Sequence, residues 1–403
     1  MNYIDVNFQK NFALLSHVLP PSPSGQAMIL YRLLSGLPAG SYCLISRENY
    51  EGDKHNDSIS SKLSGRYYHL NPVFQLPILN YSKLFALNIA FNALLGIYNR
   101  AKQIQKILQK EKCKLLIACT GDLYDLPAAC LVSKWLKIPF VPYIFDDYAY
   151  QWTGFYRSIS KRLEPIILKR AKAVIVPNEY MQKEYIQRYG LRSTVIYNSC
   201  PLPDLEELDK ADRVFNNHEI NIVYTGAIYH ANYDAFRNLI TAIQQLKRSD
   251  IKLHLYTAQP ESDLKRNDIS GPMVVYHPHI NQSEVPKVLR QATVLFLPLA
   301  FDSPIPEVIK TSAPGKIGEY LSVGRPILVH APDDSFLSWY FHTNHCGVVV
   351  DKDDTKILSQ EINKLISDDE MQMELGRHAR SMAERDFSID KMQANFLGLL
   401  KLV

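Results

Sequence analysis

The stretch TSAPGKIGEYLSVGRP, residues 311–326, carries the densest set of structural signals in the 403-residue chain. Thr311 and Ser312 precede a helical pattern, and their hydroxyls are of the kind that cap a helix N-terminus. Gly324 suits the left-handed position just beyond a helix, and the apolar run 327–330 that follows predicts a strand. The segment therefore predicts a short helix leading into a buried strand, the repeating unit of a parallel α/β fold.

Lys316 is out of place in this predicted helix. A cation in the first turn opposes the helix dipole, at a cost of up to about 1 kcal/mol at an exposed site. A bound anion would remove the conflict, because the free N–H groups around Gly315 and the ammonium would converge on it. Glu319 lies one turn further along the same face, where its carboxylate is placed to accept hydrogen bonds from ribose hydroxyls. An ordinary surface pair of Lys316 and Glu319 is the alternative.

Short apolar runs alternate with helical patterns on both sides of this segment, which predicts two Rossmann-like halves of parallel α/β structure. The predicted strands are 12–18, 42–46, 115–119, 140–145, 173–177 and 194–197, then 221–225, 252–256, 273–276, 294–297, 327–330 and 347–350. Helical patterns between them include 24–34, 84–109 and 178–189. Ligands bind beyond the carboxyl ends of parallel strands, so loops from both halves are expected to line a cleft.

The chain is long enough for two domains. Residues 1–200 are predicted to form an N-terminal domain, and the polar stretch 201–219 a linker. Residues 220–375 are predicted to form a C-terminal domain. The helical pattern of 376–403 is expected to pack back toward the N-terminal domain.

Composition places the protein among soluble globular chains, with 46% hydrophobic and 21% charged residues. No run of ~18 apolar residues and no leader segment is present, and the six cysteines are scattered, so a cytoplasmic protein with reduced thiols is expected. Residues 1–200 hold 24 Lys and Arg against 13 Asp and Glu, whereas 201–403 hold 21 against 28. The basic first half predicts an anionic partner or surface, with a solvated basic face as the alternative.

The motif Pro-x-Lys-x-x-Glu-Tyr-x-x-x-Gly-x-Pro at 314–326 resembles the donor-site motif of the family 4 retaining glycosyltransferases. Two further segments agree with this resemblance: 221–226, NIVYTG, is similar to the first strand of that family's C-terminal domain, and 170–178, RAKAVIVPN, to the close of its N-terminal domain. The resemblance implies the GT-B fold of two Rossmann-like domains, with 1–200 as the acceptor-side domain and 220–375 as the nucleotide-sugar-binding domain. It also implies transfer of a sugar from a nucleotide-sugar donor to a hydroxyl acceptor, in polysaccharide or glycoconjugate synthesis.

Candidate site residues follow from the residues and the resemblance together. The predicted catalytic residues are Asp146 and Asp147, which follow a strand and are placed to orient an acceptor hydroxyl, and Lys316, which would stabilise charge on the leaving diphosphate. The predicted donor-binding residues are Gly25, Gly226, His279, Ile280, Thr311, Ser312, Gly315, Lys316 and Glu319. For Asp146 and Asp147 the alternative is a pair of loop carboxylates that cap local structure; for Gly25 it is a simple turn between strand and helix.

Three positions depart from the family pattern. Thr311 stands where members commonly carry a glutamate that touches the donor sugar. Ala227 and Asn232 stand where many members carry an arginine and a lysine that clamp the diphosphate. The phosphate clamp is therefore expected to rest on Lys316 with backbone amides, or on another cation such as Arg325.

Neither a metal nor a cofactor is expected, and no nucleic-acid recognition motif accompanies the basic charge. Two basic and apolar segments, 84–98 and 154–172, suggest peripheral contact with the inner face of a membrane and an anionic or lipid-linked acceptor. For 84–98 the pattern favours a buried helix instead. Two other functions stay open: a nucleotide-sugar 2-epimerase, and a non-catalytic sugar-nucleotide-binding protein of the same fold.

Overall fold

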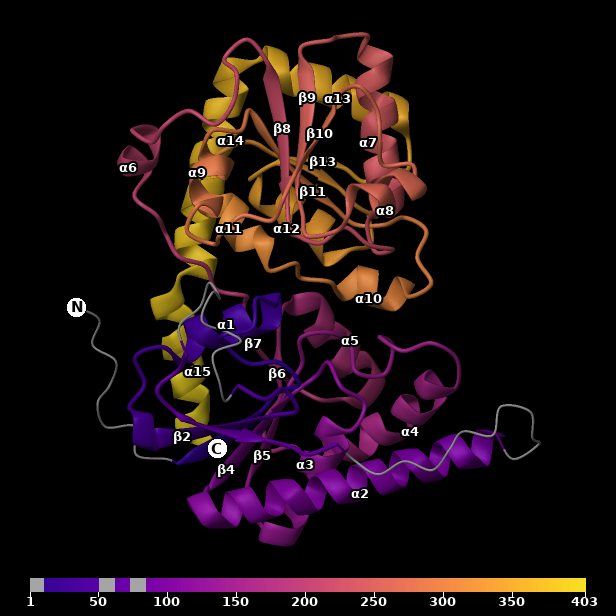
Figure 1. The fold of residues 1–403 in the computed structure, drawn as a ribbon, viewed down its shortest axis with the longest axis vertical. Helices are drawn as coiled ribbons and strands as arrows, with labels where there is room; N and C mark the ends of the chain where they lie inside the picture. Colours follow the sequence, from indigo (N-terminus) through magenta and orange to yellow (C-terminus); the bar gives the residue numbers. More distant parts are fainter. Residues whose placement is uncertain (1–10, 51–61, 73–84) are drawn as a thin grey trace. The chain divides into compact units, whose positions relative to one another are not determined.

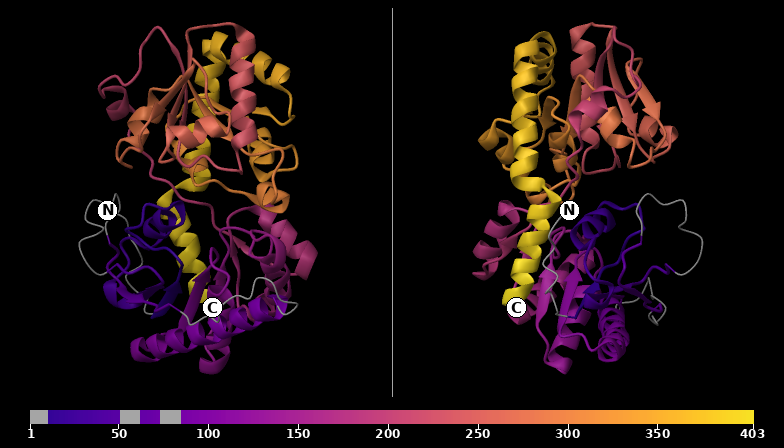
Figure 2. Two further views of the ribbon diagram at one scale, coloured as in Figure 1. Left: turned by 45° about the vertical axis from the view of Figure 1, so that its right-hand side comes forward. Right: turned by 90° about the vertical axis from the view of Figure 1, so that its left-hand side faces the viewer.

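The computed structural model describes residues 11–50, 62–72 and 85–403 (Figures 1 and 2). The chain forms two compact units. Unit 1 comprises residues up to Tyr197 together with Ile389–Val403, and unit 2 comprises Asn198–Ser388. The last helix, α15 (Ile389–Leu402), thus belongs to unit 1, whereas residues 376–388 remain in unit 2.

Unit 1 is built on a parallel sheet with strand order β3-β2-β1-β4-β5-β6-β7. The strands are β1 (Phe12–Leu15), β2 (Tyr42–Ser46), β3 (Arg66–His69), β4 (Leu115–Cys119), β5 (Phe140–Tyr143), β6 (Ile175–Val176) and β7 (Thr194–Val195). The order reverses between β1 and β4, and such a reversal opens a crevice at the carboxyl edge of the sheet, where ligands of this fold class bind.

Alternate residues of these strands enter two different cores, as the pleat of a strand requires. Ala13 and Leu15 face a core formed with α2 (Phe85–Glu111), α3 (Asp125–Leu136), α4 (Gly154–Arg170) and α5 (Glu179–Tyr189). Phe12 and Leu14 face the opposite core, formed with α1 (Gly25–Leu34) and α15. A short 3-10 turn, Ala39–Ser41, leads into β2.

Unit 2 repeats this plan with a parallel sheet of order β10-β9-β8-β11-β12-β13. The strands are β8 (Ile220–Thr225), β9 (Ile251–Tyr256), β10 (Val274–His277), β11 (Val294–Pro298), β12 (Ile327–His330) and β13 (Val348–Val350). The switch point lies between β8 and β11, beside the carboxyl end of β8.

Helices cover both faces of the second sheet (Figure 1). One core joins the strands to α7 (Tyr233–Leu246) and α13 (Thr355–Ser367). The remaining helices of this unit are α6 (Leu205–Asp209), α8 (Glu261–Arg266), α9 (Val285–Arg290), α10 (Pro306–Thr311), α11 (Lys316–Ser322), α12 (Phe336–Asn344) and α14 (Asp369–Met382), which ends in a π-helical turn, Ala383–Phe387.

The structure corrects the expectation of a buried helix at 84–98. Helix α2 buries one side, including Ile89, but leaves an apolar stripe exposed: Leu87 is 66%, Phe91 54% and Leu94 62% exposed. Spacings of four and three residues place these side chains on one face of the helix. Among the described residues, no helix is both long and apolar enough to cross a membrane.

Candidate active site

The segment 311–326 forms two short helices and not the single helix expected from its capping signals. Thr311 ends α10, where its hydroxyl donates to the carbonyl of Glu307 at 3.1 Å, so it does not cap the next helix. Ser312 is extended, and α11 begins at Lys316 after Gly315, which has no side-chain cap. Pro314 explains the break, because proline disfavours helical conformation in the residue before it. The left-handed Gly324 (φ 61°) is found where the sequence predicts it.

The ammonium of Lys316 lies against the turn that follows β8. Its Nζ is 2.5 Å from the hydroxyl of Tyr224 and 3.9 Å from the centre of that ring. At Gly226 (φ 115°), a Cβ would stand 2.9 Å from the same Nζ. The structure therefore brings together two predicted donor-binding residues, Lys316 and Gly226, and only a residue without a side chain leaves room for this approach.

Tyr224 was not singled out by sequence reasoning, although it contacts Lys316 directly. Its hydroxyl donates to the carbonyl of Ala227 at 2.5 Å and accepts from the side-chain amide of Asn232 at 3.4 Å. In the sequence Tyr224 reads as an ordinary core residue of a strand. The only available signal was its place at the carboxyl end of that strand, one residue before the Thr-Gly pair.

Enclosure by protein atoms lowers the pKa of Lys316 to about 7, although the nearby Glu319 carboxylate acts in the opposite direction. The lysine as a whole is only half-buried. An ammonium so poor in solvent contact gains most from an anion, because the anion replaces the lost hydration. Lys316 is thus a cation that lacks a carboxylate partner within salt-bridge distance among the described residues.

Glu319 accepts a hydrogen bond from the loop that follows β10. The side-chain amide of Gln282 donates to Oε1 of Glu319 at 2.9 Å. This loop also carries His279, which is exposed, and Ile280, which is half-buried. These two predicted donor-binding residues thus lie in a loop that is hydrogen-bonded to the helix of Lys316.

A hydrogen bond from Asn198 stabilises the turn between α10 and α11. The amide of Asn198 donates to the carbonyl of Ala313 at 2.8 Å. Thr311 is 2% exposed and its hydroxyl is used within its own helix, so the position predicted to contact a donor sugar offers no free hydroxyl in this arrangement. Arg325 donates from Nε to the carbonyl of Arg290, which anchors it to α9.

In unit 1, Asp146 and Gly25 both lie at the carboxyl edge of the sheet. Gln26 donates from Nε2 to Ser16 Oγ at 3.0 Å and to the Thr120 carbonyl at 3.1 Å, which joins the ends of β1 and β4. Thr120 Oγ1 in turn accepts from the backbone N–H of Asp146 at 3.2 Å. Desolvation raises the pKa of Asp146, and Asp147 adds to the effect, although Asp146 keeps contact with solvent.

Asp147 has the structural role that was the alternative to catalysis. It is fully buried and pairs with Arg188. Its Oδ1 accepts from the backbone N–H groups of Ala149 at 3.0 Å and Tyr150 at 3.1 Å. Asp146 lies in a bend after β5 and keeps contact with solvent, whereas the side chain of Asp147 is enclosed in the core.

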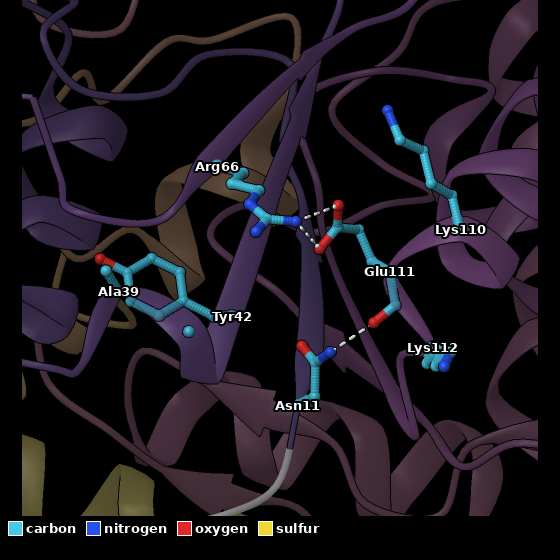
Figure 3. A pocket seen from close by; sticks show the side chains of 8 residues that line it. Asn11, Ala39, Tyr42, Arg66, Lys110, Glu111 and Lys112 are labelled. Atoms are coloured by element: carbon cyan, nitrogen blue, oxygen red, sulfur yellow. Dashed lines mark hydrogen bonds and ion pairs between the residues drawn. The ribbon is translucent and has the colours of Figure 1, made fainter.

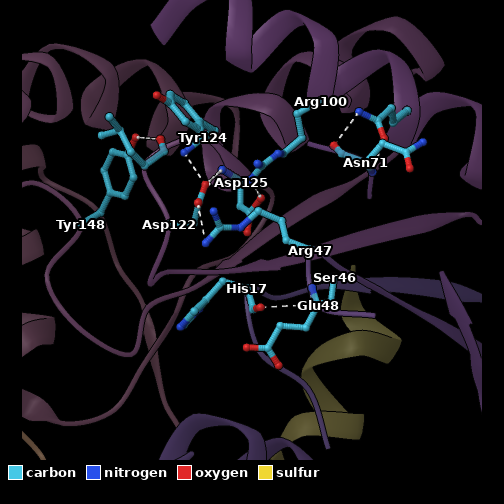
Figure 4. Close-up of polar contacts among 12 residues, drawn as sticks. His17, Ser46, Arg47, Glu48, Asn71, Arg100, Asp122, Tyr124, Asp125 and Tyr148 are labelled. Atoms are coloured by element: carbon cyan, nitrogen blue, oxygen red, sulfur yellow. Dashed lines mark hydrogen bonds and ion pairs between the residues drawn. The ribbon is translucent and has the colours of Figure 1, made fainter. Parts of the chain in front are cut away.

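A charge cluster near the same edge, buried except for Arg47, was not predicted (Figure 4). Arg100 of α2 donates to Asp122 at 2.9 Å and to Asp125 at 2.6 Å, and Arg47 pairs with Asp122 at 3.1 Å. Burial, and next the Asp122 charge, raise the pKa of Asp125 to about 7. This cluster fastens the middle of α2 to the start of α3, and its four members come from three separate parts of the chain, which explains why no local pattern revealed it.

A surface hollow of about 240 Å³ lies at the other edge of the first sheet, before β1 and β2 (Figure 3). Asn11, Tyr42 and Lys110 are among its lining residues, and Arg66 closes one wall through a two-bonded pair with Glu111. It contains none of the predicted site residues. Within the described part of the chain, no group of three or more His, Cys, Asp or Glu side chains has the arrangement of a metal site.

Two protein-family models match the chain. The model described as Glycosyltransferase Family 4 matches residues 78–202, and the model described as Glycosyl transferases group 1 matches residues 219–368. The matches do not overlap and occur in the order expected for the two halves of such an enzyme. A search of curated protein sequences gives no match.

Solved structures match over nearly the whole chain. A glycosyltransferase from Rickettsia africae is similar with a TM-score of 0.69 at 14% identity, covering 98% of both chains. HepE from Anabaena, solved with UDP and glucose, has a TM-score of 0.67 at 14% identity, covering 98% of this chain and 100% of that one. Sucrose-phosphate synthase from Thermosynechococcus elongatus has a TM-score of 0.67 at 16% identity, covering 98% of both.

The two sheets, their strand order and these matches confirm the predicted fold class, the GT-B architecture of two Rossmann-like domains. The protein is a glycosyltransferase. Within that class it is a family 4-like enzyme, as the motif at 314–326 indicated. The individual site residues stay predictions, and the geometry around Lys316 is the strongest support that any of them has.

Proposed function

We propose that this glycosyltransferase takes its sugar from a nucleotide-sugar donor whose diphosphate binds at Lys316 and Gly226. The observation that carries this proposal is the Lys316 ammonium, held within contact distance of a glycine turn at the switch point of the second sheet. Backbone N–H groups and a single cation at such a place favour a phosphate. HepE, a protein of the same fold, has been solved with UDP-glucose, which agrees with this class of donor.

The chemistry asked of the site is stabilisation of a leaving diphosphate. As the bond from the sugar to the phosphate breaks, negative charge grows on the phosphate oxygens, so a fixed cation binds the transition state more tightly than the ground state. Lys316 supplies this charge from the protein, and we propose that the reaction retains the configuration of the sugar and proceeds without a bound metal. On the acceptor side, we assign the orienting of a hydroxyl to the Asp146 carboxylate, and its exposure at the carboxyl edge of the sheet supports this role.

Nucleotide binding tests the proposal. Thermal-shift and calorimetric titrations with UDP, GDP, ADP and CMP, and then with their sugar conjugates, should find one diphosphate that stabilises the protein. Lys316→Ala should remove that stabilisation, and activity should persist in EDTA. If no nucleotide stabilises the protein, the donor proposal is wrong.

Product analysis separates the remaining functions. Transfer of the sugar to an added acceptor identifies a transferase. Release of free nucleotide with a 2-epimerised sugar identifies an epimerase, and binding with no turnover identifies the non-catalytic alternative. Asp146→Asn provides a further check, because it should lower turnover strongly and leave nucleotide affinity within about twofold.

We further propose that the acceptor is lipid-linked or anionic and that α2 contacts the inner face of a membrane. Its exposed stripe of Leu87, Phe91 and Leu94 has no charged neighbour on the helix before Arg100. At the far end of the stripe, Lys102 lies over the rings of Tyr98 and Trp135, at 5.5 Å and 4.7 Å. Aromatic rings beside lysines and an aliphatic face match the composition of the interface of a lipid bilayer.

Surface charge supports the same assignment. Between residues 85 and 172, twelve Lys and Arg residues are exposed, whereas Asp146 is the one exposed carboxylate. The other acidic residues of this range lie in internal pairs, such as Asp122 with Arg100 and Asp147 with Arg188. An excess of this size between residues 85 and 172 attracts anionic lipid, with about 1 kcal/mol for each basic residue near the surface.

Vesicle sedimentation tests the membrane contact. The protein should pellet with phosphatidylglycerol vesicles at low salt, and pure phosphatidylcholine or 0.5 M NaCl should weaken the binding. The triple variant Leu87→Ser, Phe91→Ser, Leu94→Ser should lose at least about tenfold in partitioning, because each side chain contributes its buried area. The matched control, Ile357→Ser with Met373→Ser, removes exposed apolar side chains from unit 2 and should bind as the wild type does. Equal binding by the triple variant would contradict the role of α2.

A further inference from the structure

Tyr224 contacts the Lys316 ammonium through its hydroxyl. It lies on β8, 1% exposed, and its ring meets Phe236 edge-on at 4.8 Å between ring centres. A tyrosine enclosed in this way has few rotamers available, so its hydroxyl is held at one position. Within the described part of the chain, that hydroxyl is the only group at hydrogen-bonding distance from Lys316 Nζ.

The contacts of the Tyr224 hydroxyl use its whole bonding capacity. A phenolic hydroxyl has one proton to donate and two lone pairs that accept. The proton goes to the Ala227 carbonyl at 2.5 Å, and the lone pairs accept from Asn232 Nδ2 at 3.4 Å and Lys316 Nζ at 2.5 Å. Asn232 is itself fixed, because its Oδ1 accepts from the backbone N–H of Tyr229 at 2.9 Å.

We propose that Tyr224 is a positioning residue of the donor site, whose hydroxyl, oriented by Ala227 and Asn232, holds the Lys316 ammonium at the Gly226 turn. The proposal rests on the proposed donor function of Lys316. An ammonium has three N–H groups, and Tyr224 takes one, which leaves two for the oxygens of a diphosphate. The ring face below the ammonium, 3.9 Å away, stabilises the same position.

Preorganisation is the physical consequence. A free lysine side chain has four rotatable bonds, and fixing it on a ligand costs conformational entropy at the moment of binding. Because Tyr224 already holds the Lys316 side chain in the folded protein, this entropy is lost during folding. The cation is therefore in place before the phosphate arrives. Removal of the hydroxyl alone should therefore weaken phosphate binding even though the ring and the fold remain.

The test uses Tyr224→Phe and a matched control, Tyr340→Phe. Tyr340 is equally buried in unit 2, and its hydroxyl donates to Asp386 at 2.8 Å, a contact without Lys316. Binding of inorganic pyrophosphate, of the tightest of UDP, GDP and ADP, and of the matching nucleoside is measured by calorimetry. Tyr224→Phe should lose about tenfold in affinity for both phosphate ligands and nothing for the nucleoside, whereas the control keeps wild-type affinities.

A double-mutant cycle with Lys316→Ala shows whether Tyr224 acts through the lysine. If it does, Tyr224→Phe causes no further loss once Lys316 is absent. Additive losses, or a loss for the nucleoside as well, would overturn the proposal.

A second readout needs no ligand. The pH dependence of Lys316 acetylation, followed by peptide mass spectrometry, reports directly on the ammonium. Loss of an accepting hydroxyl destabilises the charged form, so Tyr224→Phe should move the midpoint of acetylation to lower pH. An unchanged midpoint would overturn the proposal even if wild-type protein bound no phosphate, an outcome that would separately overturn the donor function.

Discussion

Lys316 is the residue on which the proposed donor site depends, and its protonation should control ligand binding there. Burial holds its pKa at about 7 in the free protein, and a bound diphosphate favours the charged form and raises that pKa. Binding should therefore take up protons between about pH 7 and pH 9, and affinity should fall as pH rises through this range. Calorimetry at pH 8 in two buffers of different ionisation enthalpy measures the uptake. Lys316→Ala should abolish it and lower the affinity by about 10- to 100-fold.

Gly226 gives a second test at the same scale, with Gly25 as its control. A Cβ at Gly226 would meet Lys316 Nζ at 2.9 Å on a backbone with φ 115°, whereas a Cβ at Gly25 would meet nothing within 4 Å. Gly226→Ala should lower the free energy of unfolding by about 1 to 3 kcal/mol and weaken nucleotide binding. Gly25→Ala should leave stability unchanged. A loss of activity in Gly25→Ala with an intact fold would support the predicted approach of a substrate to this residue.

The elements show where local sequence signals suffice. The strands at 42–46, 115–119 and 327–330 have the predicted bounds because each is a buried apolar run between turns. Strand β3 was missed, since RYYH at the edge of the sheet is half-exposed and carries no apolar run. At 311–326 the glycine and the following strand were predicted, but the two-helix break depends on backbone preference before Pro314, which outweighs the capping signal.

In the candidate site too, local sequence signals identify some residues, and others depend on contacts between distant parts of the chain. Lys316 and Glu319 could be found because they violate or complete a helical pattern in one segment. Tyr224, by contrast, acquires its role from a contact that spans more than ninety residues, and strand periodicity explains its burial without that contact. Asp147 and Arg188 form a pair of the same long-range kind, so a carboxylate that looks catalytic in sequence proves to be part of the core.

Side-chain hydrogen bonds through two histidines join three neighbouring strands of unit 2, and they predict that the protein loses stability at acid pH. His254 of β9 is 2.9 Å from both His277 of β10 and the Asn221 side chain of β8. Burial, and next His277, lower the pKa of His254 to about 4. The unfolded chain binds a proton near pH 6.5 and the folded one does not, so stability is complete above pH 6.5 and declines as pH falls toward 4.

Urea unfolding at pH 8 and pH 5 measures this effect. His254 alone should account for about 2 kcal/mol of the difference. In His254→Gln the difference should shrink by that amount, whereas in His342→Gln, where the histidine is exposed, it should stay as in the wild type. A wild-type protein equally stable at both pH values would contradict the assignment.

At the scale of the whole molecule, the chain leaves unit 1 after Tyr197 and returns to it at Ile389. Helix α15 completes a core that begins with β1: Phe396 is fully buried and lies edge-on to Phe12 at 6.3 Å, and Leu400 belongs to the same core. Gln393 adds hydrogen bonds to the carbonyls of Arg32, at 2.8 Å, and Ser35, at 3.0 Å. The first unit is thus incomplete until the last residues of the chain are present.

We therefore expect helix α15 to control the stability of unit 1, although most of that unit lies far earlier in the sequence. Phe396→Ala leaves a cavity in a closed core and should cost about 3 to 5 kcal/mol of unfolding free energy. Leu402→Ala, at a position that is 82% exposed on the same helix, should cost less than about 0.5 kcal/mol. Hydrogen exchange resolves the two units, and Phe396→Ala should lower protection in β1, β2 and β4 while β8 and β9 keep theirs. Equal loss of protection in both units would contradict this prediction.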